Sequence, residues 1–246
     1  MSFWPRSASR LSDVRGSWSV EDVARTPLSL IKLHHLNNSR SQRVLWLLEE
    51  LALPYEIFRY QRDPQTMLAP RSLREIHPLG KAPIIEDGSL RMAETGAIFD
   101  YLVGRYGHHL APPPDTEAYW RYRYWLHYAE GSAMPPLLCK LILKRLGALG
   151  WPARRFVDGQ IALHLDYLES QLANGPWFVA DAFSAADIMM SFPLEVATMR
   201  AGLNATRPNL WDFLARIHAR PAYQRALKRG GEYALAFAAT SGAGKA

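Results

Sequence analysis

The stretch 80–95, GKAPIIEDGSLRMAET, constrains the fold of this 246-residue chain more than any other part of the sequence. Its Asp87-Gly88 dipeptide is a strong signal for a two-residue hairpin turn between extended segments. Apolar residues flank that turn, as a pair before it and in alternation with polar residues after it. Thr95 can then cap a helix, because the apolar residues that follow recur at helical spacing. The stretch therefore predicts a β-hairpin that leads directly into a helix.

The same stretch has features of a binding site for a peptide-like anion. If the Ala82-Pro83 bond is cis, the backbone N–H and C=O groups of Ala82 point outward and can pair with an extended peptide. A helix that begins at Thr95 offers free N–H groups and a positive dipole end to a carboxylate. Glu94 supplies a carboxylate for an amino group. An ordinary hairpin packed on an ordinary helix explains these residues equally well, so the residues alone leave both interpretations open.

Composition excludes several classes of protein. Hydrophobic residues make up 48% of the chain, which is enough for a substantial core without disulfides. Cys139 is the single cysteine, so the chain has no intramolecular disulfide and no multi-cysteine metal site. The histidines at 34–35 and 108–109 are adjacent pairs that point apart, and we predict no metal site. No apolar run is long enough to span a bilayer, and we predict a cytoplasmic protein without a membrane partner.

The net charge of +6 is concentrated near the carboxyl end of the chain. From residue 216 onward, six Lys and Arg residues stand against Glu232 alone. Such a segment can attract nucleic acid or an anionic membrane. This segment lacks the aromatic-basic interleaving that is typical of single-strand binding proteins, so we favour a solvated helix face and predict no nucleic-acid partner.

The first half of the chain predicts a thioredoxin-like order of elements. Residues 1–27 are rich in Arg and Ser, lack the apolar region of a secretory signal, and are predicted to form a flexible extension. The patterns that follow predict a strand, a loop, a helix, a second strand, a short helix, and then the hairpin with its helix. Their predicted ranges are 28–33, 34–39, 41–51, 55–58, 63–76 and 80–95. Together they form an α/β domain over 28–108.

The second half predicts only helices. Pro112, Pro113 and Pro114 mark a linker at 109–115, and an all-helical domain is expected over 116–246. The helix over 116–146 should be interrupted at Pro135-Pro136. The later helices are expected at 152–172, after a capping box at 184–187, at 208–219 and at 221–237.

This organisation resembles the cytosolic glutathione transferases, whose fold joins a thioredoxin-like domain to an all-helical domain. The resemblance covers roughly 28–237. The segments that carry it are NNSRSQRVLWLLEEL, HPLGKAPII, Glu94-Thr95 with AIFDYL, and FSAADIMM. The first of them, with HYAEGSAMPPL, is most similar to a bacterial and fungal branch that has a serine-containing loop after the first strand.

The resemblance implies a glutathione site and assigns its residues. Glu94 and Thr95 would hold the γ-glutamyl end, Ala82 before the cis Pro83 would pair with the cysteinyl backbone, and Lys81 would face the glycyl carboxylate. Family members use Tyr, Ser or Cys in the loop after the first strand, and this loop has no Tyr or Cys. Its candidates are Ser39, Ser41 and Asn38, and helix capping is the alternative role for both serines.

We favour Ser39 as the catalytic hydroxyl, with Asn38 as an amide donor beside it. The resemblance further implies a homodimer and glutathione as co-substrate, without a metal. The expected reaction is transfer of the glutathione thiolate to small apolar electrophiles. The pocket for these electrophiles is expected on the helix after the linker, and its candidates are Tyr124, His127, Tyr128 and Met134. A glutathione-dependent peroxidase or disulfide reductase, or a glutathione-binding or structural protein of the same fold without turnover, is the alternative.

Overall fold

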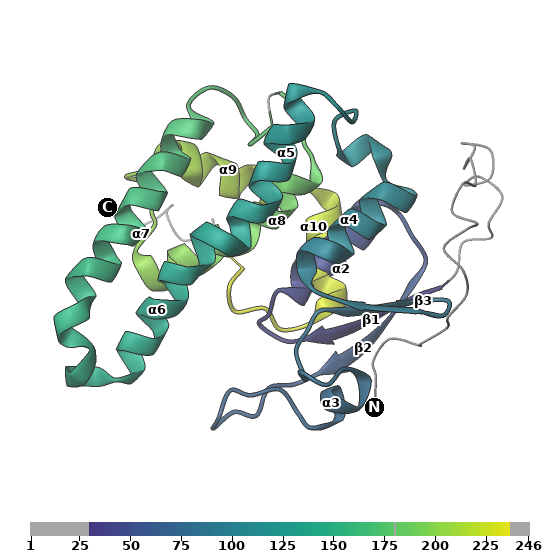
Figure 1. Ribbon diagram of the computed structural model, residues 1–246, viewed down its shortest axis with the longest axis horizontal. Coiled ribbons are helices and arrows are strands. Elements are labelled where there is room, and N and C mark those ends of the chain that lie inside the picture. Colours follow the sequence, from purple (N-terminus) through teal and green to yellow (C-terminus); the bar gives the residue numbers. More distant parts are fainter. Residues whose placement is uncertain (1–29, 180, 237–246) are drawn as a thin grey trace, which may run out of the picture.

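The computed structural model describes residues 30–179 and 181–236 (Figure 1). A four-stranded sheet has the order β2-β1-β3-β4. The central strand β1 runs parallel to β2 and antiparallel to β3, and β3 and β4 form the predicted hairpin. The strands are β1 (Ile31–Leu36), β2 (Tyr55–Tyr60), β3 (Ile84–Asp87) and β4 (Leu90–Ala93). This arrangement confirms the predicted thioredoxin-like order.

The prediction for the first strand was wrong at its end, because β1 includes His34 and His35, which the sequence placed in a loop. Both histidines are buried. The ring of His34 stacks on Phe58 of β2 at 5.3 Å, and its Nδ1 lies 2.9 Å from the hydroxyl of Tyr60. The polar character of imidazole suggested a loop, but the ring of His34 contacts Tyr60 and the ring of His35 contacts Ser41 inside the fold. The predicted start at residue 28 lies outside the described residues.

Helices lie on both sides of this sheet. Figure 1 shows α2 and α4 on the side that faces the helical domain, with the short α3 on the other side. Their bounds are α2 (Ser41–Glu50), α3 (Ser72–Ile76) and α4 (Thr95–Tyr106), and a short turn η1 (His108–Leu110) follows them. The apolar residues Val44, Leu45 and Leu48, which the sequence predicts on one face of α2, are buried, and so is the rest of the helix from residue 41 to residue 49.

The rest of the described chain is helical. The helices are α5 (Glu117–Tyr128), α6 (Met134–Arg145), α7 (Trp151–Leu172), α8 (Ala185–Ala201), α9 (Pro208–His218) and α10 (Pro221–Gly230), with short turns η2 (Ala129–Ala133) and η3 (Gly147–Gly150). The break predicted in the first long helix falls at η2, a π-turn just before the prolines. Pro135 and Pro136 lie in the first turn of α6, where a missing N–H costs no helical hydrogen bond.

The capping box before α8 is confirmed. The Asp187 carboxylate accepts hydrogen bonds from the backbone N–H of Ser184 at 2.8 Å and from that of Phe178 at 2.9 Å. The last helix is shorter than the predicted range 221–237. It ends at Gly230, because Gly231 has φ +88°, a conformation that interrupts the helix and that L side chains rarely adopt.

The basic segment of the chain packs back onto α2, and Arg225, Lys228 and Arg229 of α10 stay exposed, as expected for a solvated helix face. Arg220, the cap residue before α10, donates to both carboxylate oxygens of Glu50, at 2.6 and 2.9 Å. Arg225 and Arg229 pair with Glu49 at 2.7 and 3.2 Å. These contacts within the chain account for much of the local positive charge. Among the described residues, no helix is both long and apolar enough to cross a membrane.

Candidate active site

Three chain segments lie at one end of the sheet, because the register of the strands aligns the residues from which they continue. His34 of β1 is paired with Ile84 of β3, and Ile84 is paired with Ala93 of β4. Beyond that row, at the same end of the sheet, come Pro83 before β3, Glu94 after β4 and, after His35 and Leu36, the loop that follows β1. The structure thus brings together at this edge the segments that carry the predicted glutathione-binding residues.

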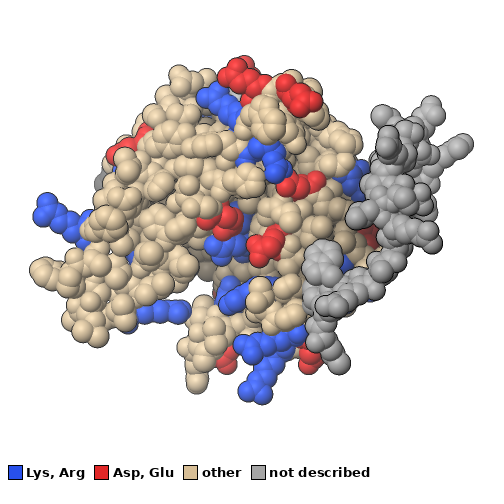
Figure 2. All heavy atoms as spheres, in the orientation of Figure 1, with Lys and Arg blue, Asp and Glu red and all other residues tan. Residues whose placement is uncertain are grey.

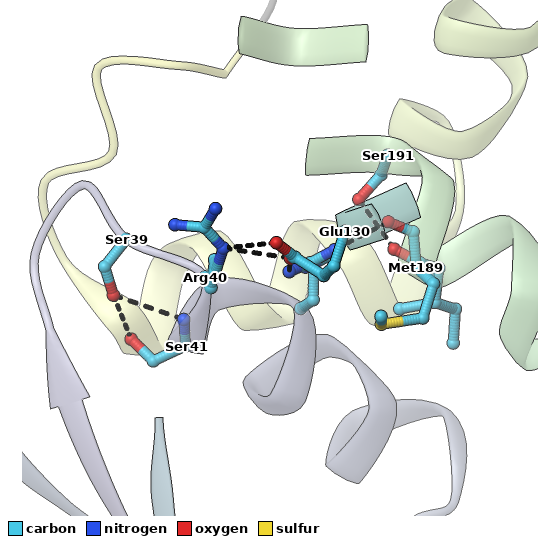
Figure 3. A network of polar contacts seen from close by, with 8 residues as sticks. Ser39, Arg40, Ser41, Glu130, Met189 and Ser191 are labelled. Atoms are coloured by element: carbon cyan, nitrogen blue, oxygen red, sulfur yellow. Dashed lines mark hydrogen bonds and ion pairs between the residues drawn. The ribbon is translucent and has the colours of Figure 1, made fainter. Parts of the chain in front are cut away.

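The loop after β1 is held by a cluster of hydroxyl contacts. The Oγ atoms of Ser39 and Ser41 lie 2.8 Å apart, and the backbone N–H of Ser41 donates to Ser39 Oγ at 3.2 Å (Figure 3). Ser41 Oγ also donates to the backbone C=O of Leu36 at 3.1 Å and accepts from its N–H at 3.2 Å. The end of β1 and the start of α2 are therefore tied together through Ser41.

His35 completes this cluster from the strand. Its Nδ1 lies 3.0 Å from Ser41 Oγ. Burial, followed by the positive charge of Arg59, lowers the pKa of His35 to about 4. The ring is therefore neutral at pH 7. It can share a proton with Ser41, but it supplies no positive charge to a nearby thiolate.

Glu94 has the most unusual backbone of the segment. Its φ of +70° and ψ of +114° are rare for an L residue, and such conformations are concentrated at functional sites. The carboxylate of Glu94 is exposed and has no partner among the described side chains. Thr95 was predicted to cap α4, and this was wrong: Glu94 occupies the cap position and Thr95, buried, is the first helical residue. The free N–H groups of the first turn of α4 therefore begin directly beside the Glu94 carboxylate.

The Ala82-Pro83 bond is cis, as the family resemblance implied. Pro83 is buried, Ala82 is partly exposed, and Lys81 is exposed. No hydrogen bond or ion pair engages Lys81 within residues 30–179 and 181–236. Its ammonium group is thus available to an anion that approaches this edge.

Asn38 has a partner that the sequence did not predict. It adopts φ +50°, the left-handed region that asparagine tolerates better than most residues. Its Oδ1 accepts a hydrogen bond from the backbone N–H of Ala234 at 2.6 Å. The segment after α10 thus reaches across the chain to the loop after β1. No local pattern in either segment could have indicated this contact.

A second unpredicted group connects this loop to the helical domain. Glu130 of η2 accepts from Arg40 Nε at 2.8 and 2.9 Å, and it also pairs with the buried guanidinium of Arg43 (Figure 3). Arg43 further donates to the backbone C=O of Met189 at 2.7 Å. Burial opposes the charged form of Glu130, but the charges of Arg43 and Arg40 outweigh it and lower the pKa of this carboxyl. In the sequence, the only indication that Glu130 connects the two parts of the chain was its place beside the predicted helix break.

The four residues predicted to line the electrophile pocket differ in environment, although the rings of Tyr124 and Tyr128 lie 5.5 Å apart. Tyr128 and Met134 are buried in the core, and the Tyr128 hydroxyl lies against His164 Nδ1. Tyr124 is exposed, with its hydroxyl 3.1 Å from that of Tyr167. His127 is exposed beside Arg123. None of them lines the cavity of about 490 Å³ that lies between α6, α7 and the end of α8. Within the described ranges, no cluster of three or more His, Cys, Asp or Glu side chains has metal-binding geometry.

Family comparisons agree with this geometry. The family model described as "Glutathione S-transferase, N-terminal domain" matches residues 28–104, and the one described as "Glutathione S-transferase, C-terminal domain" matches residues 152–229. Among curated proteins, glutathione S-transferase 1 of Saccharomyces cerevisiae is 36% identical over 195 residues, which cover 70% of this chain and 83% of the relative. Glutathione S-transferase 3 of Schizosaccharomyces pombe is 34% identical over 215 residues, covering 81% of this chain and 88% of that protein.

Solved structures give the same result for the fold. The crystal structure of a glutathione S-transferase from Actinobacillus pleuropneumoniae superposes with a TM-score of 0.76 at 36% identity. The alignment covers 84% of this chain and 95% of that one. The order of strands and the helical second half are therefore explained by common ancestry as well as by physics.

Proposed function

This chain belongs to the glutathione S-transferase family, and we propose that it transfers the thiolate of glutathione to a small electrophile with an apolar body. The observation that carries this proposal is the convergence at one sheet edge of the Ser39 loop, the cis Ala82-Pro83 peptide and the strained Glu94. Each of these features suits a different part of an extended tripeptide that carries charged groups at both ends. The cytoplasmic location, the homodimer and the domain limits at 28–108, 109–115 and 116–246 stay predictions.

The two ends of glutathione would be held by charge. The amino group of its γ-glutamyl end would pair with the carboxylate of Glu94, and the adjacent carboxylate would accept N–H bonds from the helix start at Thr95. The glycyl carboxylate would face the free ammonium of Lys81. Between them, the backbone of Ala82 would pair with the cysteinyl residue as an added strand does. These contacts position the sulfur near the loop after β1.

In this proposal, Ser39 acts on the sulfur. A free thiol has a pKa of about 8.5, so only a few per cent is ionised at neutral pH. A hydroxyl that donates a hydrogen bond to the sulfur favours the thiolate, and a shift of two pKa units corresponds to about 2.7 kcal/mol. Ser41 Oγ is already committed to Leu36 and His35. Ser39 has fewer partners and retains a small exposed fraction, which supports its assignment. Asn38 would contribute its side-chain N–H beside it.

The reaction would then be a nucleophilic displacement or addition. In a displacement, the sulfur forms a bond to the electrophilic carbon, the leaving group departs with its electron pair, and the thiol proton passes to solvent. In an addition, the electron pair of the attacked double bond moves to the neighbouring atom, which takes up a proton from solvent. The protein's main contribution is to hold the two reactants together and to keep the sulfur ionised.

Conjugation of glutathione to 1-chloro-2,4-dinitrobenzene by the purified protein tests this function. Retention on immobilised glutathione, together with conjugate formation above the uncatalysed rate, supports a transferase. Retention without conjugation of a broad panel of electrophiles supports a glutathione-binding protein instead. Absence of both retention and conjugation would overturn the glutathione site itself.

A further inference from the structure

The cavity between α6, α7 and the end of α8 is strongly asymmetric in charge. Its volume is about 490 Å³, enough for a small organic molecule. Its lining residues are Lys140, Leu141, Leu143, Lys144, Arg154, Val157, Asp158, Met199, Arg200 and Leu235. The apolar side chains in this set can accept an apolar body. The charged ones are four cations and a single acid.

The positive charge of this cavity is not neutralised by the chain around it. Asp158 pairs with Lys140 at 2.9 Å, which leaves three cations. Lys144, Arg154 and Arg200 have no acidic partner among residues 30–179 and 181–236. Arg200 is partly buried, and burial, followed by the positive charges of Arg40 and Arg145, lowers the pKa of its guanidinium. A partly buried cation surrounded by like charges is a favourable partner for an anion from solution.

The cavity adjoins the proposed glutathione site. Arg200 lies close enough to Arg40, the neighbour of Ser39, for their charges to interact, and Arg62 interacts with both. Leu235, which lines the cavity, follows the residue whose backbone N–H donates to Asn38. Figure 2 shows a hollow between the helical domain and the thioredoxin-like domain below it, with Lys and Arg side chains around the rim of the hollow. A molecule in the cavity would therefore lie beside the loop that carries Ser39.

We propose that this cavity binds the second substrate and selects an organic anion, an apolar or aromatic electrophile that carries a carboxylate or sulfonate, with Arg200 as its main anchor. This inference rests on the proposed function, because the molecule bound in the cavity is a substrate only if the protein is a transferase. It replaces the expectation of a purely apolar electrophile. The anionic group takes no part in the bond changes: the sulfur displaces the leaving group at a carbon elsewhere on the same molecule. The charge serves to orient that carbon toward the loop after β1.

Binding of a non-reactive pair of ligands tests the inference without any turnover. By titration calorimetry, 3,5-dinitrobenzoate should bind the purified protein roughly five- to tenfold more tightly than its methyl ester. In Arg200→Gln, the ratio of the two affinities should fall toward one. The matched control is Arg155→Gln, which removes an exposed arginine of α7 that does not line the cavity and should keep the wild-type ratio. Equal affinities for acid and ester in the wild-type protein, or an unchanged ratio in Arg200→Gln, would overturn the proposal.

A reactive pair then separates this inference from the proposed function. The substrates are 4-chloro-3,5-dinitrobenzoate and its methyl ester, from which glutathione displaces chloride. A lower KM for the acid, lost in Arg200→Gln, supports both proposals. Conjugation of both compounds without preference for the acid keeps the transferase and rejects the anion site. Tight binding of 3,5-dinitrobenzoate without any conjugation keeps the anion site and rejects the transferase.

Discussion

The Oγ atoms of Ser39 and Ser41 lie 2.8 Å apart, yet the two residues occupy different environments. Ser41 is fully buried and bonded to both backbone groups of Leu36, whereas Ser39 keeps an exposed fraction of 5%. A hydroxyl engaged on every side holds the loop in shape. A hydroxyl at the edge of the same cluster can still turn its proton toward a ligand. The pair thus divides into a structural serine and a candidate catalytic serine.

Ser41→Ala should lower the free energy of unfolding by about 1–3 kcal/mol, because it leaves the buried N–H and C=O of Leu36 without their side-chain partner. The sequence suggested helix capping as the role of Ser41, but Arg40 occupies the cap position and Ser41 is the first residue of α2. Urea unfolding followed by circular dichroism measures the change. A loss below about 0.5 kcal/mol would contradict the structural role.

Glu130→Gln should destabilise the protein by about 3–5 kcal/mol at pH 7, because it leaves the buried guanidinium of Arg43 without a counter-charge. The pKa of Glu130 is lowered in the folded state, so its stabilising contribution is complete above the ordinary carboxyl pKa. That contribution is lost as the pH falls through the lowered folded value. The difference between wild type and variant should therefore shrink in acid. Urea unfolding at several pH values measures it.

The control for this variant is Asp100→Asn, which breaks the exposed ion pair with Arg123. Exposed pairs contribute about 0–1 kcal/mol, so this change should cost little. Equal effects of the two substitutions would show that Glu130 does not act as a buried counter-charge.

Glu94→Gln should weaken glutathione binding by about 1.5–3 kcal/mol, or roughly ten- to a hundredfold, because it removes the charge opposite the amino group of the ligand. The side chain keeps its size and the change adds no β-branch at the unusual φ of this position. Glu56→Gln on β2 is the control, since Glu56 is exposed and far along the strand from the ligand edge. Calorimetry that finds unchanged affinity in Glu94→Gln would remove Glu94 from the site.

Assembly is a separate prediction. The family resemblance implies a homodimer, and aromatic residues at 11% of the chain together with many arginines suit an interface. Sedimentation velocity at micromolar concentration should give a single species of twice the chain mass. A monomer across that range would contradict the prediction, and it would leave the glutathione site confined to one chain.

The local features of the fold were predictable because each has a short-range cause. Asp87-Gly88 requires a tight turn, and the Ser184-Asp187 spacing predicts a capping box whatever lies elsewhere in the chain. The end of β1 was not predictable, because His34 is stabilised by Phe58 and Tyr60 on a strand that follows later. The polarity of a single residue does not indicate which distant residues will contact it in the fold.

The candidate site divides in the same way. Its edge could be predicted in part, because the proline and the helix start are local signals, whereas the cis state of the Ala82-Pro83 bond was implied only by the family resemblance. The contacts of Asn38 with Ala234 and of Arg43 with Glu130 join segments far apart in the chain, so no pattern within either segment predicts them. The cavity with Arg200 was missed for a related reason. Its charges come from three helices, and no pattern within any one of these helices predicts that their charges face a common cavity.

The central claim is that the Ser39 hydroxyl stabilises the glutathione thiolate. A hydrogen bond to a charged group contributes about 1.5–3 kcal/mol, so Ser39→Ala should raise the pKa of bound glutathione by about one to two units. Turnover at neutral pH should fall roughly ten- to a hundredfold, and the loss should shrink at high pH, where the thiol ionises unaided. Affinity for glutathione should change little, since its two charged ends supply most of the binding.

Thiolate absorbance of the glutathione complex against pH, in wild type, Ser39→Ala and Ser41→Ala, is the most direct test. The account predicts a raised thiol pKa in Ser39→Ala and a nearly unchanged one in Ser41→Ala. A shift in Ser41→Ala alone would make Ser41 the catalytic hydroxyl. No shift in either variant would transfer thiolate stabilisation to Asn38 or to the backbone N–H groups at the start of α2, and would contradict the claim.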